Sequence, residues 1–489
     1  MRSTEGIGEE SRVIEGYFGR GSILVGERLD IHVSTDSASF RVDFYRIGAV
    51  HEFAGSTEWF PGQQAPAPAH PDRVAGHASP AVDWRWPIYR FTPLPHWNPG
   101  VYVAAFVESP DVPCDIHPLD GFGRAFFVLR SRDPGRAPIL YKISSFTWHA
   151  YNRSDGPRIE RAGSLYDHPV YLPGHDGGPI GHTVSMHRPG RLFDLSYWDA
   201  PFIGWLERAG YRVEFCTDLD LHVDPELLRG HRLLLSVGHD EYWTAAMRER
   251  VERFVRTGGN VAFFSANTCW WRMHVTDDGT ALVADTDHRV GDVFPHLPAT
   301  DQWWTPKPHG VGMPENTLTG VSFRNGGMWP TEGPWPGDRP RTGFTVQHAD
   351  HWVYEGTGLR DGRDGGPADV LAAGLPLIGY ECDGAAFSYD ENGVARPTGA
   401  DGTPQSFLIL GIAVLHPVHE DIHHLRMGHW NCASREPDST GPRAATMGIH
   451  TQGGTVFTAA TTDWPVIVGQ DCDPAVDRVT RNVLDRLSR

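Results

Sequence analysis

Alternating apolar and polar residues characterise the first quarter of the chain. Arg28–Asp36 reads RLDIHVSTD and Ser39–Gly48 reads SFRVDFYRIG, and the same alternation continues in Pro99–Ser109 and Gly123–Arg130. A two-residue period places one face of a strand on a core and the other in solvent. Short strands of this kind, separated by turn residues, predict a β-sandwich domain over residues 1–133.

The pattern changes after residue 134, where continuous apolar strands alternate with amphipathic helices. We expect strands at Ile139–Ser144, Tyr211–Asp218, His231–Gly238, Asn260–Asn267 and Gly454–Pro465. We expect helices at Ala200–Gly210, from Asp224–Pro225, at Thr244–Gly259 and at Asp473–Arg489. This order predicts a parallel, doubly wound α/β domain over residues 134–489, with a sheet like that of glutamine-amidotransferase-like domains. Residues 274–404 are rich in Gly, Pro, Asp and Trp, which predicts a loop-rich insertion.

Composition narrows the class of protein. The formal net charge of -18 argues against a nucleic-acid surface and against binding to anionic membranes. No basic stretch followed by an apolar run begins the chain, and no apolar run is long enough to span a bilayer. The six cysteines form no C-x-x-C pair, so we expect neither a thiolate zinc site nor a disulfide framework. A cytoplasmic location is therefore expected.

Polar side chains follow three of the predicted strands. Tyr151 follows the first strand, His239 and Glu241 follow His231–Gly238, and Asn267 ends the next strand. Ligands of open α/β sheets bind outside the carboxyl ends of the strands, so these residues are candidates for a site. Taken singly, a glutamate after a strand is most often a solvated charge at a helix start, and an asparagine an ordinary turn residue.

A resemblance makes the chemistry more specific. The block Ser236–His274 resembles the central part of the N,N-dimethylformamidase large (beta) subunit-like family, with its His-x-Glu-Tyr-Trp turn, a helix ending in Gly-Gly, and a strand ending near Asn. Thr147–Asn152, Gly163–Asp167, Gly210–His222 and Gly379–Gly384 match further blocks of that family in the same order. The resemblance implies a mononuclear Fe(III) held by Tyr151, Tyr166 and Glu241. The short spacing between the two tyrosines leaves Tyr141 or Tyr171 open as a replacement for one of them.

The activity that the resemblance implies is hydrolysis of a C–N amide bond in a small, formamide-type N-substituted amide. Hard, anionic oxygen donors suit Fe(III), which would polarise the carbonyl and activate water. Glu381 would act as general base, His239 would orient water or Glu241, and Asn267 would donate to the carbonyl oxygen. Whether the chain needs a small partner subunit, as the best-known member does, or forms a homo-oligomer stays open.

Three other readings compete with this one. The histidine-rich stretch His416–His429 could bind zinc for a hydrolase, although Pro417 interrupts any helix there and the H-E-x-x-H order is absent. Cys269 follows a strand and could be a nucleophile, but a buried core thiol is the more frequent role for such a cysteine. The third reading is a non-catalytic carbohydrate-binding or assembly protein with exposed tryptophans.

Overall fold

In the computed structural model the chain divides into two units. The first comprises Met1–Arg130 and Tyr151–Phe193, and the second Ser131–Ala150 and Asp194–Arg489. The structure describes residues 14–65, 84–109, 119, 123–152, 183–284, 302–304, 306–307, 310–328, 342–363, 365–414 and 443–489, and the backbone of 73–74 and 77–78.

The first unit is built of strands. One antiparallel sheet has the order β1-β3-β9, with bounds Glu15–Phe18, Leu29–Ser34 and Ile88–Phe91. A second sheet has the order β2-β11-β10-β4-β5, with bounds Ser22–Leu24, Arg124–Arg130, Gly100–Val107, Ser39–Arg46 and Glu52–Ser56. The short strands β6 (Phe60–Pro61), β7 (Arg73–Val74), β8 (His77–Ala78) and β13 (Thr183–Ser185) complete this unit. The prediction of a β-rich N-terminal part is confirmed.

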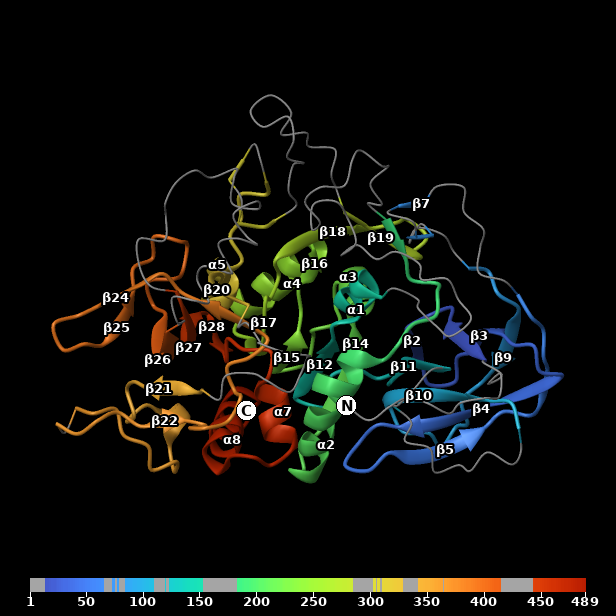
Figure 1. The fold of residues 1–489 in the computed structure, drawn as a ribbon, viewed down its shortest axis with the longest axis horizontal. Coiled ribbons are helices and arrows are strands. Elements are labelled where there is room, and N and C mark those ends of the chain that lie inside the picture. Colours follow the sequence, from blue (N-terminus) through green and yellow to red (C-terminus); the bar gives the residue numbers. More distant parts are fainter. Residues whose placement is uncertain are drawn as a thin grey trace, which may run out of the picture. The chain divides into compact units, whose positions relative to one another are not determined.

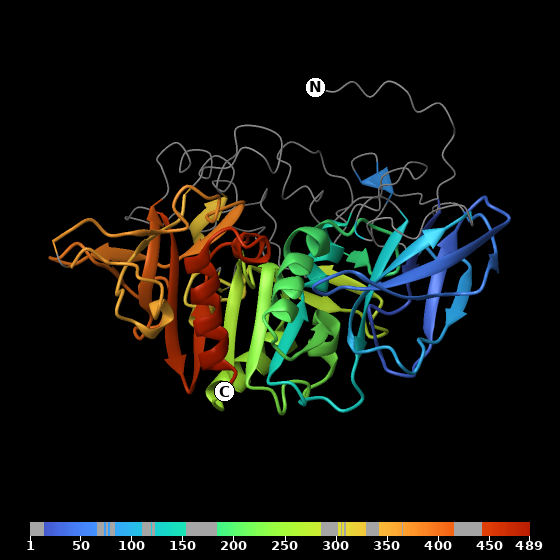
Figure 2. The same ribbon diagram turned by 90° about the horizontal axis from the view of Figure 1, so that it is seen from below.

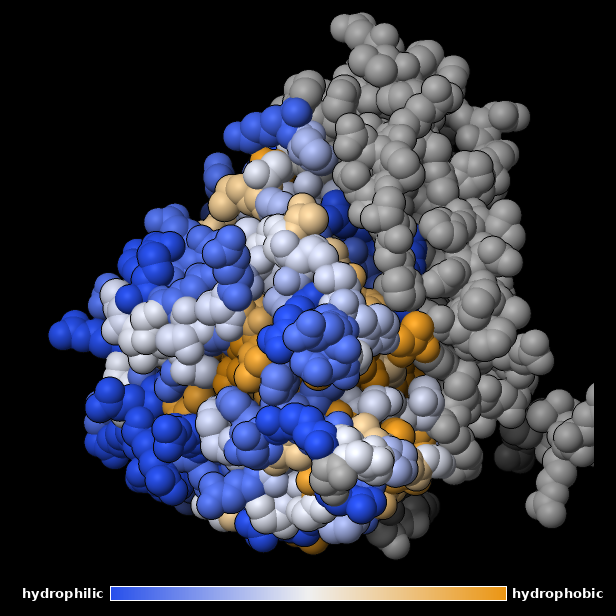
Figure 3. Space-filling view, turned by 90° about the vertical axis from the view of Figure 1, so that its left-hand side faces the viewer, coloured by the Kyte–Doolittle hydropathy of each residue, from blue (hydrophilic) through white to orange (hydrophobic). Residues whose placement is uncertain are grey.

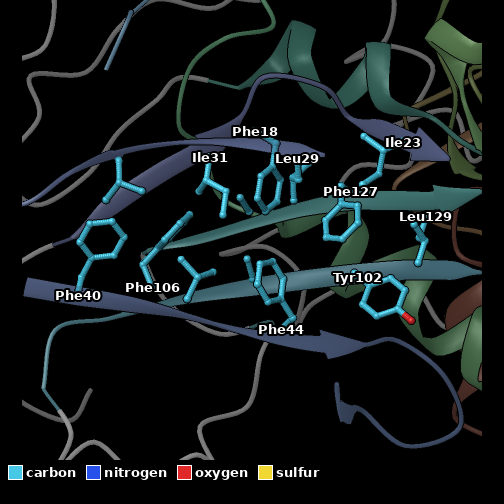
Figure 4. Packing of buried hydrophobic residues seen from close by; sticks show 14 of the residues in the cluster. Phe18, Ile23, Leu29, Ile31, Phe40, Phe44, Tyr102, Phe106, Phe127 and Leu129 are labelled. Carbon is cyan, nitrogen blue, oxygen red and sulfur yellow. The ribbon is translucent and has the colours of Figure 1, made fainter. Parts of the chain in front are cut away.

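One apolar core joins the two sheets of the first unit. Figure 4 shows Leu29 and Ile31 of β3 facing Phe44 of β4 and Phe127 of β11. Burying side chains of this size is the main source of stability for such a two-layer structure. The alternating pattern predicts these inward positions correctly, but all eight residues of β10 are buried, so this strand has no solvent-facing side.

The second unit is organised around a nine-stranded sheet of order β14-β12-β15-β17-β28-β27-β26-β21-β22. The strands from β14 to β28 run parallel, with bounds Val213–Thr217, Ile139–Ile143, Leu233–His239, Asn260–Ala266 and Gly454–Thr458. The strands from β27 to β22 are antiparallel, with bounds Ala444–Gln452, Leu408–Val414, Phe344–Val346 and Val370–Leu371. The prediction of a parallel sheet is therefore wrong for this second half.

Helices cover both faces of the parallel strands. The helices α3 (Asp218–Val223) and α4 (Ala245–Arg256) pack on one face, and α2 (Ala200–Arg208), α7 (Trp464–Gly469) and α8 (Pro474–Leu487) pack on the other (Figures 1 and 2). This agrees with a doubly wound arrangement, while the likeness to glutamine-amidotransferase-like domains stays a prediction. None of the described helices is long and apolar enough to cross a membrane.

One local prediction in the second unit is wrong. No helix starts at Asp224–Pro225, where the chain forms turns instead. The helix begins earlier, because Thr217 caps α3: its hydroxyl accepts from Asp220 N while the Asp220 side chain accepts from Thr217 N. This capping box is visible in the sequence TDLD and is the signal that the apolar pattern alone misses.

The predicted loop-rich insertion contains more regular structure than expected. It supplies β21 and β22 to the edge of the main sheet, the pair β20 (Ser322–Met328) and β23 (Glu381–Gly384), and the hairpin β24 (Phe387–Tyr389) and β25 (Ala395–Pro397). Hydrophilic side chains cover much of the surface on the side that carries this hairpin, with hydrophobic residues showing between them (Figure 3). Other short elements lie before the insertion or within it. They are α1 (Ser145–Tyr151), η2 (Leu195–Asp199), β16 (Tyr242–Thr244), β18 (Trp271–Val275), β19 (Ala281–Ala284), α5 (Asn316–Thr319) and the turn η3 (Trp352–Tyr354).

Candidate active site

Two neighbouring strands bring predicted site residues to one edge of the sheet. His239 is the last residue of β15, and it pairs with Ala266, the last residue of β17. Asn267 therefore begins its turn directly beside His239, as the rule for strand ends predicts. Gly238 has a φ of 74°, and a Cβ there would lie 2.6 Å from the Cβ of Trp198, so this position requires glycine.

The insertion supplies the third member of the cluster. Glu381 is the first residue of β23, and its Oε2 lies 2.8 Å from Nε2 of His239. The same nitrogen lies 3.2 Å from Oε2 of Glu241. His239, Glu241 and Glu381 are only 5%, 3% and 4% exposed. The structure thus brings together three of the residues that the sequence singles out, as one imidazole between two buried carboxylates.

The charge of this cluster is dominated by carboxylates. Burial opposes protonation of His239, but the charges and hydrogen bonds of Glu381 and Glu241 outweigh it and raise the pKa of the imidazole well above its usual range. Asp194 stands near the same group: burial, opposed by the positive charge of His239 and helped by Glu381, raises its pKa to about 6. An imidazolium surrounded by three carboxyl groups leaves an excess of negative charge at this edge.

Aromatic side chains surround the imidazole. The rings of Trp198 and Tyr380 both lie 6.0 Å from that of His239, edge to face. The indole nitrogen of Trp271 donates to Oε1 of Glu241 at 2.8 Å, so the two oxygens of this carboxylate have different partners. The backbone is held as well, since Thr147 Oγ1 accepts from the amide of Glu241 at 2.9 Å. These contacts fix the carboxylate in an apolar surrounding, where electrostatic interactions are strong.

Hydrogen bonds from backbone amides hold the turn at Asn267. It has a φ of 49°, and its amide donates to Oδ1 of Asp383 at 2.8 Å, while the amide of Thr268 donates to Oδ2 at 3.3 Å. Burial raises the pKa of Asp383 well above its usual range, against the effect of these two amides. Side-chain Oδ1 of Asn267 is buried and accepts no hydrogen bond from the described residues. Asp383 connects the Asn267 turn to the strand that carries Glu381, a link that the sequence does not predict.

The tyrosines of the predicted iron site are only partly described. Tyr151 is the last residue of α1 and is half-buried. Tyr166 and the alternative Tyr171 lie outside the described residues. The other alternative, Tyr141, lies in the middle of β12, where its hydroxyl donates to Asp199 at 2.8 Å. Burial and the charge of Asp199 raise the pKa of Tyr141 well above its usual range, which favours the phenol over the phenolate that iron binds.

Of the two rival sites, the described residues include only Cys269. His416–His429 lies outside the described residues, so the zinc hypothesis stays a prediction. Within the described ranges, no group of three or more His, Cys, Asp or Glu side chains is arranged to hold a metal ion. Cys269 is buried, and burial raises the pKa of its thiol, so it is a poor nucleophile. The prediction of a core thiol at this position is confirmed.

A buried ion cluster beside the site was not predicted. Nζ of Lys142 on β12 lies 2.6 Å from Oδ1 of Asp218 and 2.7 Å from Oδ1 of Asp240, and none of these side chains is exposed. The signal in the sequence is a lysine inside the apolar strand ILYKI. A lysine there needs buried counter-charges, because an unpaired charge in a core is strongly unfavourable.

Together, the fold and the site define a two-unit protein whose α/β unit holds a buried acid–histidine cluster at the carboxyl ends of parallel strands. Residues 37–474 match the family described as N,N-dimethylformamidase beta subunit-like, C-terminal, and the chain belongs to this family. An N,N-dimethylformamidase beta subunit of Alcaligenes sp is 26% identical over 417 residues, covering 74% of this chain and 50% of the relative. The corresponding subunit of Paracoccus aminophilus is 25% identical over 413 residues, with the same coverage. The chain thus spans about half the length of these curated relatives.

Proposed function

We propose that this protein hydrolyses the C–N bond of a small N-substituted amide of the formamide type. The observation that carries the proposal is the buried set His239, Glu241 and Glu381 at the strand ends of the sheet. A buried imidazole of raised pKa, in contact with two buried carboxylates at such a position, is typical of catalytic sites. The names of the two relatives, both N,N-dimethylformamidase beta subunits, support the substrate class.

One proposed ligand in the described cluster, the carboxylate of Glu241, has the chemistry that suits a hard cation. Glu241 offers a buried carboxylate, and the nearby carboxyl groups of Glu381 and Asp194 give an excess of negative charge that a cation would neutralise. In the proposal, Glu241 holds an iron(III) ion together with Tyr151 and Tyr166. Bound iron would supply Lewis acidity, polarising the amide carbonyl and lowering the pKa of water.

The protein's own side chains would carry the protons. The carboxylate of Glu381 takes a proton from the attacking water as the C–O bond forms, and returns it to the nitrogen as the C–N bond breaks. The products are an acid and an amine. His239 holds both glutamates through one nitrogen and so keeps Glu381 in place. Asn267 would donate its amide to the carbonyl oxygen as negative charge develops there.

The surroundings of the site favour small substrates with apolar substituents. Trp198 and Tyr380 present aromatic rings around His239, and each of the three central residues is at most 5% exposed. The faces of aromatic rings suit N-alkyl groups. N,N-Dimethylformamide is therefore the first substrate to test, followed by longer N-alkyl formamides.

Glu381→Gln tests the role of the proposed base. The change keeps the size of the side chain but removes the proton acceptor, so we expect kcat for release of dimethylamine to fall roughly 10²–10⁴-fold. Iron content, measured by elemental analysis, should not change. Glu391→Gln is the matched control, because Glu391 is an exposed glutamate outside the cluster. Turnover of Glu381→Gln at the rate of the unmodified enzyme would disprove the proposed role.

Assembly with another chain is also part of the proposal. Both relatives are named as beta subunits, which supports a partner subunit or a homo-oligomer. The mass of the purified protein, measured by light scattering during size exclusion, tests this, since the single chain has a mass of 54.2 kDa. A monomer with full amidase activity would argue against the need for any partner.

A further inference from the structure

The ion cluster around Lys142 shares a stretch of chain with the candidate site, because Asp240 lies between His239 and Glu241. Lys142, Asp218 and Asp240 are wholly buried, and the ammonium group also lies 5.1 Å from the centre of the Trp243 ring. Burial disfavours the charged amine, but the two aspartates outweigh this and raise the pKa of Lys142 above its usual value. A charged group of this kind is costly to bury, so its position in the fold calls for an explanation beyond stability.

The aspartate of this cluster stands between two residues of the site. Asp240 follows His239 and precedes Glu241, and every oxygen of its carboxylate has a partner. Oδ1 accepts from Nζ of Lys142 at 2.7 Å and from the Trp243 indole at 3.0 Å, and Oδ2 accepts from Ser236 Oγ at 2.5 Å. These hydrogen bonds hold the side chain of Asp240 in one buried position.

The residues on either side of Asp240 have other partners. Nε2 of His239 lies 3.2 Å from Oε2 of Glu241 and 2.8 Å from Oε2 of Glu381, and Oε1 of Glu241 accepts from the indole of Trp271. Asp240 joins these two residues along the chain, so fixing its side chain restricts the turn of backbone that carries both of them. We propose that Lys142 and Asp240 are positioning residues that orient His239 and Glu241 toward the reacting groups. This inference rests on the proposed function for its chemistry, but not for its geometry.

A matched pair of variants separates positioning from simple stability. Asp240→Asn and Asp218→Asn each remove one negative charge from the same lysine, at equal burial. Only Asp240 lies in the turn of the site, whereas Asp218 begins α3, and an asparagine there can still accept the hydrogen bond from the amide of Phe146. If the cluster serves stability alone, the two changes should have similar effects on every readout.

The first readout needs neither metal nor substrate. The indole N–H of Trp271 donates to Oε1 of Glu241, so its NMR resonance reports the position of this carboxylate. We expect Asp240→Asn to shift this resonance in the metal-free protein and Asp218→Asn to leave it unchanged. Trp271→Phe assigns the resonance by removing it. If Asp240→Asn does not fold, Ser236→Ala replaces it, because this change removes only the hydroxyl that holds Oδ2 of Asp240.

The second readout is iron affinity, measured by competition with a chelator, together with kcat and KM for N,N-dimethylformamide. We expect Asp240→Asn to weaken iron binding or lower kcat roughly 10–100-fold, the usual effect of losing a group that orients a ligand. A shift of the Trp271 resonance in a protein that binds no iron would sink the iron proposal and leave the positioning role intact. An unshifted resonance, or equal effects of the two variants, would overturn the positioning role.

Discussion

Burial determines which charged side chains of this protein need charged partners. Lys142, inside an apolar strand, and Glu381, inside an insertion of weak periodicity, both lie in the interior with charged partners. The motif resemblance predicts Glu381, and the structure brings it to His239, whereas nothing in the resemblance predicts the partners of Lys142. Contacts between residues far apart in the sequence depend on strand order, which periodicity does not encode.

Glu241 is the residue on which the metal proposal depends most. Glu241→Ala should remove the only described carboxylate assigned to iron, and we expect iron content to fall from about one ion per chain toward zero, with loss of any visible absorption band. Elemental analysis of the purified variant measures this. Glu391→Ala, at an exposed position, is the control. Full iron content in Glu241→Ala would reject this residue as a ligand.

The buried carboxyl group of Glu315 should make the stability of the protein depend on pH. Burial, opposed by a hydrogen bond from Ser322, raises the pKa of Glu315 from its usual range to about 7. Between these pKa values the folded protein holds a proton that the unfolded chain releases. The free energy of unfolding should therefore fall as pH rises from roughly 4.3 to 7, by an amount on the order of 3 kcal/mol.

Glu315→Gln should remove this contribution. We expect the free energy of unfolding of the variant, from urea titrations at pH 5 and pH 8, to decline less between the two values than that of the unmodified protein. Glu355→Gln is the control at an exposed position. An identical decline in Glu315→Gln would show that another group carries the effect.

Whole elements were predicted better than single contacts. The helices α2, α4 and α8 start within one residue of their predicted positions and end within three, because their apolar stripe and their start and stop residues agree. The antiparallel half of the main sheet was missed, since periodicity shows that a strand is buried but not which way its neighbours run. The all-buried strand β10 shows the same limit within the first unit.

The start of α8 depends on one residue. Asp473 accepts hydrogen bonds from the amides of Ala475 and Val476 at 2.8 and 2.9 Å, and Pro474 follows it at the first helical position. Replacing the cap by alanine leaves these amides without a partner, so we expect Asp473→Ala to cost about 1 kcal/mol of stability. Urea unfolding measures this, and Asp473→Asn, which keeps an acceptor, should recover most of it.

For the molecule as a whole, each unit has a buried apolar cluster among its described residues, so a defect in one unit should be traceable. Phe127 lies in the core of the first unit, with ring contacts to Phe18, Phe44 and Tyr102. Phe127→Ala should destabilise this unit by about 3–5 kcal/mol through lost burial and a cavity. Proteolysis during heating, with fragments identified by mass, should show cleavage beginning within residues 14–130. Early cleavage within 194–489 instead would contradict a defect confined to the first unit.

The origin of Glu381 has a consequence for how this family can change. Glu241 and Asn267 follow the parallel strands β15 and β17, while Glu381 and Tyr380 belong to a segment between β17 and the last strands of the sheet. One carboxylate beside the histidine thus follows a strand of the main sheet, and the other belongs to the 274–404 segment. Replacing this segment by that of a relative would therefore exchange Glu381, Tyr380 and the edge strands β21 and β22 together, while His239, Glu241 and Asn267 would stay as they are.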